Sequence, residues 1–307
     1  MPTTVHTLET FGLLAFTGPD ARAFLQGQLS CDVEGLAAEA VTPGSYSTPK
    51  GRMLATFLLW AETDGCRLLL PRELCEPLRK RLAMFILRAK VKAEDISARH
   101  RFFGLPGSTL ADILAPLGIA APAQPYRATM AAGYTALRLD VDRVLLVAPA
   151  ESVTGAAPGE PLASAAADSG AWALADIRSG LPWILPATQE QFVPQTANLD
   201  LIGGVSFRKG CYPGQEIVAR MHYLGRLKER MLRAHVDAPP PAPGTRLYSA
   251  AFGAQAAGTV VNAAPSPDGG SELLAVAQLA AAGTLALAQP DGPRLRSLPL
   301  PYAVPQA

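Results

Sequence analysis

The apolar residues of the chain fall into short runs typical of strands and a few longer stretches with helical spacing. A first strand is predicted at 11–18 (FGLLAFTG), and a helix at 19–29 with Pro19 near its first turn. Two further apolar runs, 53–60 and 66–70, flank a short polar turn sequence, which predicts a β-hairpin. The N-terminal part therefore reads as an α+β arrangement.

A longer stretch, 72–91, predicts one amphipathic helix with Lys and Arg on its polar face. Its apolar face is formed by Leu74, Leu78, Leu82 and Phe85. Pro77 either kinks this helix or marks its first turn. A second hairpin is predicted within 134–149, whereas 150–170 is rich in Ala, Gly, Ser and Pro and favours either a weak helix or a loop.

The C-terminal part begins with the clearest linker of the chain, APPPAPG at 238–244. Five short runs of strand type follow it, and ERMLRAHV (229–236) precedes it as a further candidate strand. This pattern predicts a small antiparallel barrel or sandwich. We therefore expect an α+β region at 1–228 and a β-barrel domain at 229–307.

The composition excludes several classes of protein. No run of 18 uncharged apolar residues is present, so we expect no membrane-spanning helix and no membrane association. The N-terminal sequence MPTTVHTLET lacks a basic region followed by an apolar stretch, so we expect no secretory signal and a cytoplasmic protein. The four cysteines form no C-x-x-C pair and the four histidines have no partner spacing, so no self-contained metal site is expected.

The charge of the chain is balanced overall and uneven locally. The net charge is +1, yet 72–101 carries nine Lys or Arg and four Asp or Glu, and 208–233 carries seven and two, so each segment is at +5. Two basic segments facing one cavity would favour an anionic ligand, while two solvated helix faces are the simpler alternative. The balanced total argues against direct nucleic-acid binding.

The stretch FRKGCYPGQEIVAR (207–220) carries the clearest candidate chemistry. The glycines at 210 and 214 permit backbone angles that other residues resist, and Glu216 falls in the first turn of a predicted helix. Cys211 therefore lies just outside a helix N-terminus with Lys209 nearby, and both features lower the pKa of a thiol. These residues alone leave two alternatives open, a reactive thiol and a small structural cysteine in a turn. His222 is eleven residues further on and cannot be placed near the thiol from the sequence.

The string KGCYPGQE (209–216) resembles, at seven of its eight positions, the signature of the YgfZ-type folate-binding proteins. Members of this family are implicated in the assembly or repair of iron–sulfur clusters and, through it, in tRNA modification. They are relatives of the aminomethyltransferase (T-protein) of the glycine cleavage system. The resemblance extends over most of the chain, with further similar stretches at 16–32, 49–52, 192–220 and 299–302.

The resemblance implies a T-protein-like fold, with two interwoven α+β subdomains and a C-terminal antiparallel β-barrel around a central cavity for tetrahydrofolate. It implies that Trp172, in WALADIRSGLP, stacks on the folate, and it places Phe11 at the position of a second such aromatic residue. A core position at a strand start is the alternative for Phe11. Arg178 occupies the position of a pterin-reading Glu; a guanidinium cannot accept a hydrogen bond, so Asp176 is the alternative acceptor.

One departure from T-protein bears on the reaction. T-protein carries an Asp pair for aminomethyl transfer, and the comparable stretch here, KGRMLATFLLW (50–60), has no carboxylate. This argues against that mechanism and leaves open whether the protein is an enzyme; a folate-dependent one-carbon transferase is the alternative function. A module that only touches a protein or tRNA is a third hypothesis.

The function that we expect is that of a folate-binding factor for iron–sulfur proteins, with tetrahydrofolate or a derivative as cofactor. Its functional thiol is Cys211, tuned by Lys209, within a motif that also contains Gly210, Tyr212, Gly214, Gln215 and Glu216. The expected partners are iron–sulfur client or assembly proteins, and the protein is expected to be a monomer. No metal ligands are assigned.

Overall fold

The protein folds into two compact units, each built from separated segments of the chain. The computed structural model describes residues 5–153, 162, 166–167, 170–223, 225 and 227–305. The first unit comprises Met1–Gln26, Val33–Thr42 and Phe57–Ser169, and the second comprises Gly27–Asp32, Pro43–Thr56 and Gly170–Ala307. Helices and strands occur together, which confirms the mixed class expected from the sequence. The division into 1–228 and 229–307 stays a prediction.

A five-stranded sheet is built in the order β3-β4-β5-β2-β6. Its strands are β2 (Phe11–Thr17), β3 (Val41–Ser47), β4 (Met53–Glu62), β5 (Gly65–Pro71) and β6 (Lys92–Asp95). β4 and β5 pair antiparallel, with Glu62 opposite Gly65, so the predicted hairpin is confirmed. Helix α1 (Ala21–Gln26) is shorter than the predicted 19–29.

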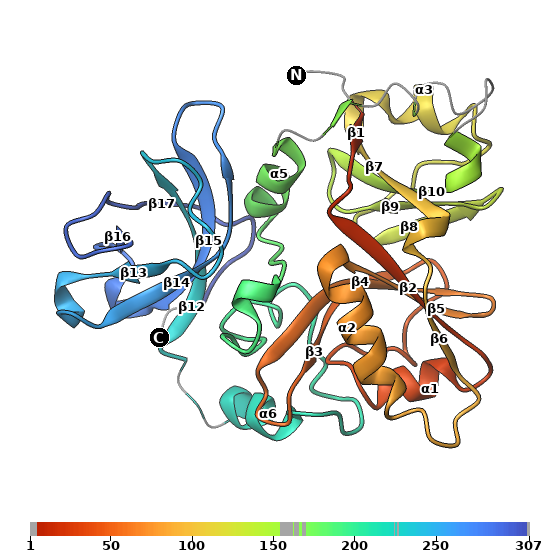
Figure 1. Ribbon diagram of the computed structural model, residues 1–307, viewed down its shortest axis with the longest axis horizontal. Helices are drawn as coiled ribbons and strands as arrows, with labels where there is room; N and C mark the ends of the chain where they lie inside the picture. The colour runs from red at the N-terminus through yellow and green to blue at the C-terminus, as the bar shows by residue number, and fades with distance from the viewer. Residues whose placement is uncertain are drawn as a thin grey trace. The chain divides into compact units, whose positions relative to one another are not determined.

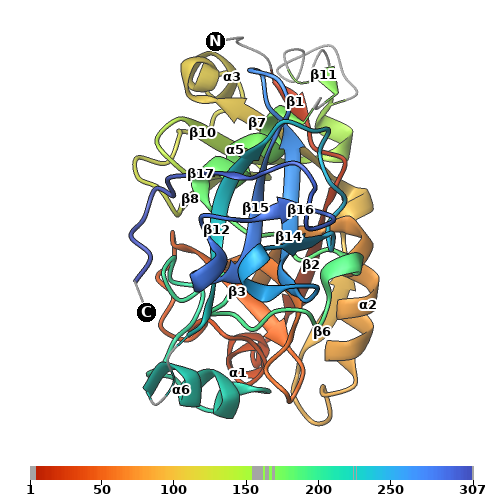
Figure 2. The ribbon, with the colours of Figure 1, turned by 90° about the vertical axis from the view of Figure 1, so that its left-hand side faces the viewer.

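Helix α2 (Arg72–Ala83) packs on β2 and β6 through its buried leucines (Figures 1 and 2). The prediction of one helix over 72–91 was wrong at its C-terminal end, because the helix stops at Ala83. Phe85 is 47% exposed and the neighbouring Met84 and Leu87 are exposed as well, so the apolar face is not continued against the sheet. Without such packing, helix propensity alone gives little stability. Pro77 lies inside the helix.

The first unit contains a second sheet, in the order β11-β1-β7-β10-β9-β8. Its strands are β1 (His6–Thr7), β7 (His100–Pro106), β8 (Arg127–Ala131), β9 (Tyr134–Arg138), β10 (Arg143–Pro149) and β11 (Ala166–Ala167). β9 and β10 pair antiparallel, which confirms the hairpin predicted within 134–149. Helix α3 (Leu110–Leu114) shares an apolar core with this sheet. Of the stretch 150–170, a 3₁₀ turn at Ala150–Val153 is described, and most of the remainder lies outside the described residues.

The C-terminal strands form a six-stranded sheet in the order β16-β13-β14-β15-β12-β17, antiparallel throughout. They are β12 (Glu229–Val236), β13 (Arg246–Tyr248), β14 (Ala256–Pro265), β15 (Ser271–Gln278), β16 (Ala286–Leu287) and β17 (Arg296–Leu298). The antiparallel β character is thus as expected, and the predicted linker at 238–244 contains no helix or strand. In the pairings of residues 227–305, β16 and β17 are edge strands, so closure into a barrel stays a prediction.

Two helices complete the second unit. Helix α5 (Ala171–Ser179) packs on β14 and β15, and α6 (Gln215–Tyr223) follows a long stretch without regular structure. Besides the turn at Ala150–Val153, the described residues contain the short 3₁₀ turns η1 (Ser97–Arg99), η2 (Gly107–Thr109), η4 (Pro186–Thr188), η5 (Ala250–Phe252) and η6 (Leu279–Ala281). None of the described helices is long and apolar enough to cross a membrane.

Candidate functional site

The KGCYPGQE motif forms a loop that leads into helix α6 in the second unit. The helix starts at Gln215, where the backbone N–H donates to the carbonyl of Tyr212 at 3.1 Å. Glu216 lies in the first turn, where a carboxylate interacts favourably with the helix dipole. Cys211 lies in the loop four residues before the helix, and its side chain is exposed. The sequence prediction of a cysteine just outside a helix N-terminus is therefore confirmed.

Two glycines hold this loop against the PKGR turn at 49–52. Gly214 has φ of +83°, and a Cβ atom there would lie 2.6 Å from both Gly51 Cα and Thr48 O. On the other side of this contact, a Cβ on Gly51 would lie 3.1 Å from Ile217 Cβ on α6. Backbone therefore packs directly on backbone, which only glycine permits. The contact brings together two stretches that are far apart in the sequence and that both carry the family resemblance.

Lys209 fixes the other end of the motif. Its Nζ donates to the carbonyl oxygens of Leu29 at 2.6 Å and Cys31 at 2.9 Å, and lies 5.0 Å from the ring centroid of Tyr212. A second hydrogen bond also reaches this segment, since the Ser30 hydroxyl donates to Gly204 O at 2.6 Å. The ammonium group thus ties the loop to the segment Gly27–Asp32. The proposed tuning of the thiol by Lys209 stays a prediction.

Tyr212 points inward beside Cys31. Its side chain is 7% exposed, and its hydroxyl has no hydrogen-bond partner among the described residues. Burial, with a smaller contribution from Cys31, raises the pKa of Tyr212 to about 12. The phenol therefore stays protonated and neutral at physiological pH, and the side chain anchors the loop by packing.

The four cysteines lie in very different surroundings. Cys211 is exposed, whereas Cys31, Cys66 and Cys75 are fully buried; all four lie within the described residues and none forms a disulfide. Burial raises the pKa of the Cys66 thiol to about 11 and that of Cys75 to about 12. Buried thiols of this kind are unreactive, so Cys211 is the accessible thiol of the chain. In the part of the chain that the structure describes, no three His, Cys, Asp or Glu side chains are grouped to hold a metal ion.

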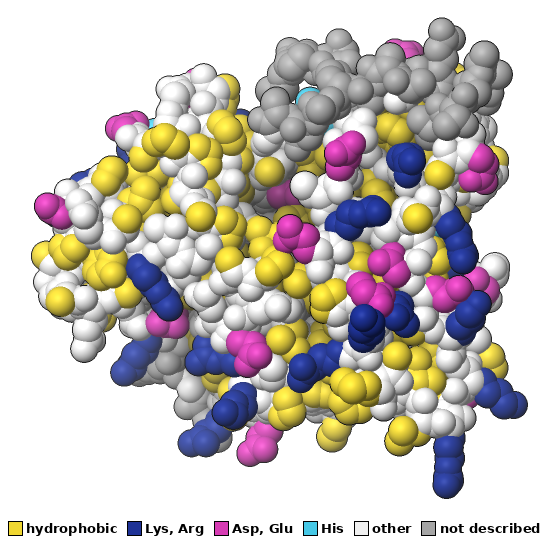
Figure 3. Space-filling model, viewed as in Figure 1, with side chains coloured by type: hydrophobic (Ala, Val, Ile, Leu, Met, Phe, Trp, Pro, Cys, Tyr) yellow, Lys and Arg dark blue, Asp and Glu magenta, His cyan; other side chains and the backbone are white. Residues whose placement is uncertain are grey.

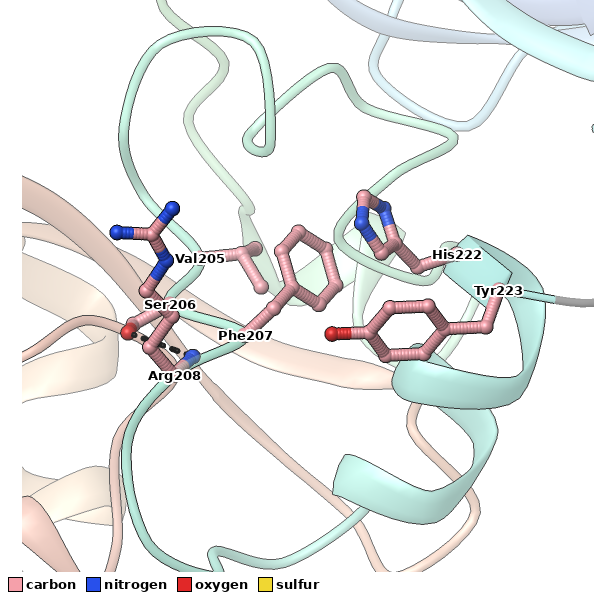
Figure 4. Close-up of a pocket in the computed structure, with 6 residues that line it drawn as sticks. All are labelled: Val205, Ser206, Phe207, Arg208, His222 and Tyr223. Carbon is pink, nitrogen blue, oxygen red and sulfur yellow. Dashed lines mark hydrogen bonds between the residues drawn. The ribbon is translucent and has the colours of Figure 1, made fainter.

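An aromatic cluster, which sequence reasoning did not find, flanks the motif. The rings of Phe207 and His222 stack with centroids 3.7 Å apart and an interplanar angle of 14°, and Tyr223 packs edge-on against both. The cluster borders a hollow of about 460 Å³ that Val205, Ser206 and Arg208 also line (Figure 4). His222 therefore stacks on Phe207. A separation of fifteen residues along the chain hides this pairing in the sequence.

Three of the expected folate residues lie on helix α5 in the second unit. Trp172 is 5% exposed. Asp176 is buried, and its Oδ2 accepts a hydrogen bond from Trp183 Nε1 at 2.8 Å. Arg178 donates from Nη2 and Nε to Glu272 Oε1, at 2.6 and 3.1 Å, and this hydrogen bonding raises the pKa of the guanidinium further.

Phe11, the fourth expected folate residue, lies in the first unit. It starts strand β2 and is 5% exposed. The basic segment 72–101 is in this unit too, whereas 208–233 belongs to the second.

The first unit also contains a cavity of about 730 Å³ that Arg22 and Arg67 line. Arg67 Nη2 pairs with Glu62 at 2.8 Å and Asp64 at 2.9 Å, and Arg22 donates to three backbone carbonyls. These two guanidinium groups are therefore already satisfied by the protein.

Comparison with known proteins decides the family. No protein-family model matches the chain. A tRNA-modifying protein YgfZ of Vibrio vulnificus is 34% identical over 246 residues, which cover 79% of this chain and 73% of that protein. The YgfZ protein of Yersinia pestis is 30% identical over 312 residues, covering 99% of this chain and 94% of the relative. The chain belongs to the YgfZ family.

The fold of this YgfZ-family member resembles that of T-protein. The glycine cleavage system aminomethyltransferase T of Bartonella henselae superposes with a TM-score of 0.73 at 14% identity, covering 96% of this chain and 84% of that structure. At this identity the likeness concerns the fold, so the expected resemblance to the T-protein fold is confirmed, while the closed barrel and the central cavity stay predictions. The reaction of T-protein does not follow from it.

The family implies a folate, and the expected residues fit this group unequally. Trp172 and Phe11 are covered over most of their surface, so each contributes mainly to packing. Arg178 is paired with Glu272 and is not available as an unneutralised cation. Asp176 has the acceptor chemistry that the N–H groups of a pterin require.

Proposed function

We propose that this protein acts with a folate in the assembly or repair of iron–sulfur proteins and, through them, in tRNA modification. Cys211 serves as its functional thiol. One observation carries the proposal: the motif that marks the family presents the accessible cysteine of the chain, while the other three cysteines are fully buried. The relatives in Vibrio vulnificus and Yersinia pestis are tRNA-modifying proteins by name, which supports the link to tRNA.

The surroundings of Cys211 support a thiol held at a defined place. Lys209 fixes the loop two residues before it through two carbonyls, and Gly214 fixes the loop three residues after it through backbone contact with Gly51. Tyr212, the residue after Cys211, is buried. A short loop anchored on both sides presents its exposed side chain with little conformational freedom, which favours contact with a partner at low entropic cost.

A single thiol cannot hold an iron–sulfur cluster, because such clusters are bound by several cysteines. No group of three metal-ligating side chains occurs among the described residues, so Cys211 is not part of such a group within this part of the chain. Cys211 therefore acts as a ligand or redox group shared with a client or assembly protein. Within the second unit, Asp176 supplies a hydrogen-bond acceptor for the folate.

The experiment replaces Cys211 by Ser, which removes the thiol and keeps its size. In cells that lack the chromosomal copy, the variant should fail to restore the activity of an iron–sulfur tRNA methylthiolase. Ser206→Ala, on the same loop, is the matched control and should restore it. The purified wild type should react with one equivalent of a maleimide and the Cys211→Ser variant with none. Full restoration by Cys211→Ser at equal protein level would refute the thiol role.

A one-carbon transferase is the second candidate, and the fold shared with T-protein is what favours it. The stretch that the resemblance compares with the catalytic Asp pair of T-protein is KGRMLATFLLW (50–60), and its residues include no Asp or Glu. None of these can take or give a proton as a carboxylate does. Formation of methylene-tetrahydrofolate from a small amine by the purified protein would establish this function and displace the first.

A further inference from the structure

The aromatic cluster beside the motif forms an exposed platform made of Phe207, His222 and Tyr223. Phe207 comes from the loop and the other two from the last turn of α6, and Figure 4 shows the three rings grouped together, with Phe207 and His222 face to face. Tyr223 is 66% exposed and His222 is also exposed. Large apolar side chains at the surface mark interaction sites when they gather, and this group gathers around the hollow of about 460 Å³.

Two arginines beside the platform carry charges that no ion pair neutralises within the described residues. Arg208 lines the same hollow, and Arg220 lies one turn before Tyr223 on α6, so that the two are neighbours on the helix surface. Both arginines are exposed, and neither makes an ion pair within the described residues. Figure 3 shows Lys and Arg side chains together with Asp or Glu over the region of α6, at the lower left.

Other cations of the same basic segment are already bound by the protein. Lys209 donates to two backbone carbonyls, Arg230 pairs with Asp200 at 2.7 Å, and Arg233 pairs with Glu272 at 3.2 Å. Arg208 and Arg220 therefore differ from these three in having their charge available to a partner. The unpaired charge lies on the same surface as the exposed rings.

We propose that this platform binds single-stranded RNA, with a base stacked on the exposed ring of Tyr223 and neighbouring phosphates at Arg208 and Arg220. Aromatic faces and cations in combination are the recognition chemistry of unpaired nucleotides, whose bases are accessible for stacking. A duplex hides these faces within its own stack. The contact goes beyond the proposed function, in which the protein reaches tRNA only through its clients.

The near-neutral total charge, from which no direct nucleic-acid contact was expected, does not decide the matter. Arg208 and Arg220 make no ion pair within the described residues, and electrostatic attraction is screened beyond about 10 Å at moderate salt. The local charge therefore governs binding at this surface.

The test is fluorescence anisotropy with a fluorescein-labelled single-stranded RNA of about 12 nucleotides, a length within the usual site sizes of single-strand binders. Tyr223→Ala should raise the dissociation constant roughly 5- to 150-fold, the range expected for loss of one stacked base. Tyr223→Trp should restore binding, because it restores the flat ring. Replacing Arg208 and Arg220 by Gln should reduce the slope of log K against log salt by about 1.4.

The controls are Phe85→Ala, which removes an exposed aromatic ring of the first unit, and Arg88→Gln, which removes an exposed cation near it. Both should bind like the wild type, and so should Cys211→Ser, which separates this proposal from the thiol role. Tyr223 is exposed, so its replacement leaves the urea midpoint unchanged. Equal affinity of wild type and Tyr223→Ala, or a labelled duplex bound as tightly as the single strand, would overturn the proposal. A dimer in sedimentation that Tyr223→Ala abolishes would assign the platform to a second copy and overturn it too.

Discussion

The contact between Gly214 and Gly51 makes a quantitative prediction about the motif. Substituting Gly214 by Ala places a Cβ atom 2.6 Å from Gly51 Cα and from Thr48 O, both of which are backbone atoms that cannot rotate away. The residue also has φ of +83°, a conformation that costs an L-residue about 1–2 kcal/mol. Displacing the backbone costs about 1–3 kcal/mol more.

Against these costs, alanine restricts the unfolded chain and returns about 0.4–1 kcal/mol. The free energy of unfolding should therefore fall by about 1–4.6 kcal/mol, the sum of the two penalties less this gain. Urea unfolding followed by tryptophan fluorescence measures it, and Trp172 and Trp183 lie in the same unit as the contact.

Gly210→Ala is the matched control, four residues earlier in the same motif. A Cβ atom there meets nothing within 4 Å, and the residue is not among the glycines with positive φ. Its free energy of unfolding should change by less than about 0.5 kcal/mol. If Gly214→Ala unfolds at the same urea concentration as Gly210→Ala, the close packing of the motif on the PKGR turn is refuted.

Two further predictions concern stability. Lys209→Met should lower the free energy of unfolding by about 1.5–3 kcal/mol, because two backbone carbonyls lose a charged hydrogen-bond donor. Lys228→Met, at an exposed position, should have little effect. Similar urea midpoints for the two variants would contradict this prediction. Burial raises the pKa of Cys66 from 9.0 to about 11 and that of Cys75 from 9.0 to about 12 in the folded protein. The two neutral thiols therefore contribute fully to the free energy of unfolding below about pH 9. Above that pH, each contribution falls by about 1.4 kcal/mol per pH unit until the pH reaches the pKa of the folded state. Cys66→Ala should show a shallower fall between pH ~9 and ~11 than the wild type, and an identical slope would count against it.

The hydrophobic pattern predicts the elements well where packing follows it. The hairpin of β4 and β5 and the strands after the proline linker occur at the expected places, because alternating and continuous apolar runs have one efficient way to be buried. The helix after Gly214 occurs as expected too. The stretch 72–91 is different, since Phe85 keeps the helical spacing but is not covered by the sheet, and only the tertiary structure reveals this.

The sequence predicted which residue carries the candidate thiol, but not the contacts that hold its loop in place. The motif identified Cys211 as the thiol to consider, and its exposure is a property of the folded chain. Lys209 reads in the sequence as a neighbour of the thiol, whereas its hydrogen-bond acceptors lie 180 and 178 residues away. The stacking of Phe207 on His222 likewise depends on how α6 returns to its own preceding loop.

The hydrogen bonds of Lys209 also join parts of the chain that are synthesised at different times. Their acceptors lie in Gly27–Asp32, which is a short segment of the second unit. The segments directly before and after it along the chain belong to the first unit. No single cut in the chain therefore separates the two units. During synthesis on the ribosome, the hydrogen bonds of this loop can form only after residue 209 has emerged, long after residues 29 and 31. A gene fragment that encodes only 170–307 would carry the thiol without the carbonyl groups that anchor its loop.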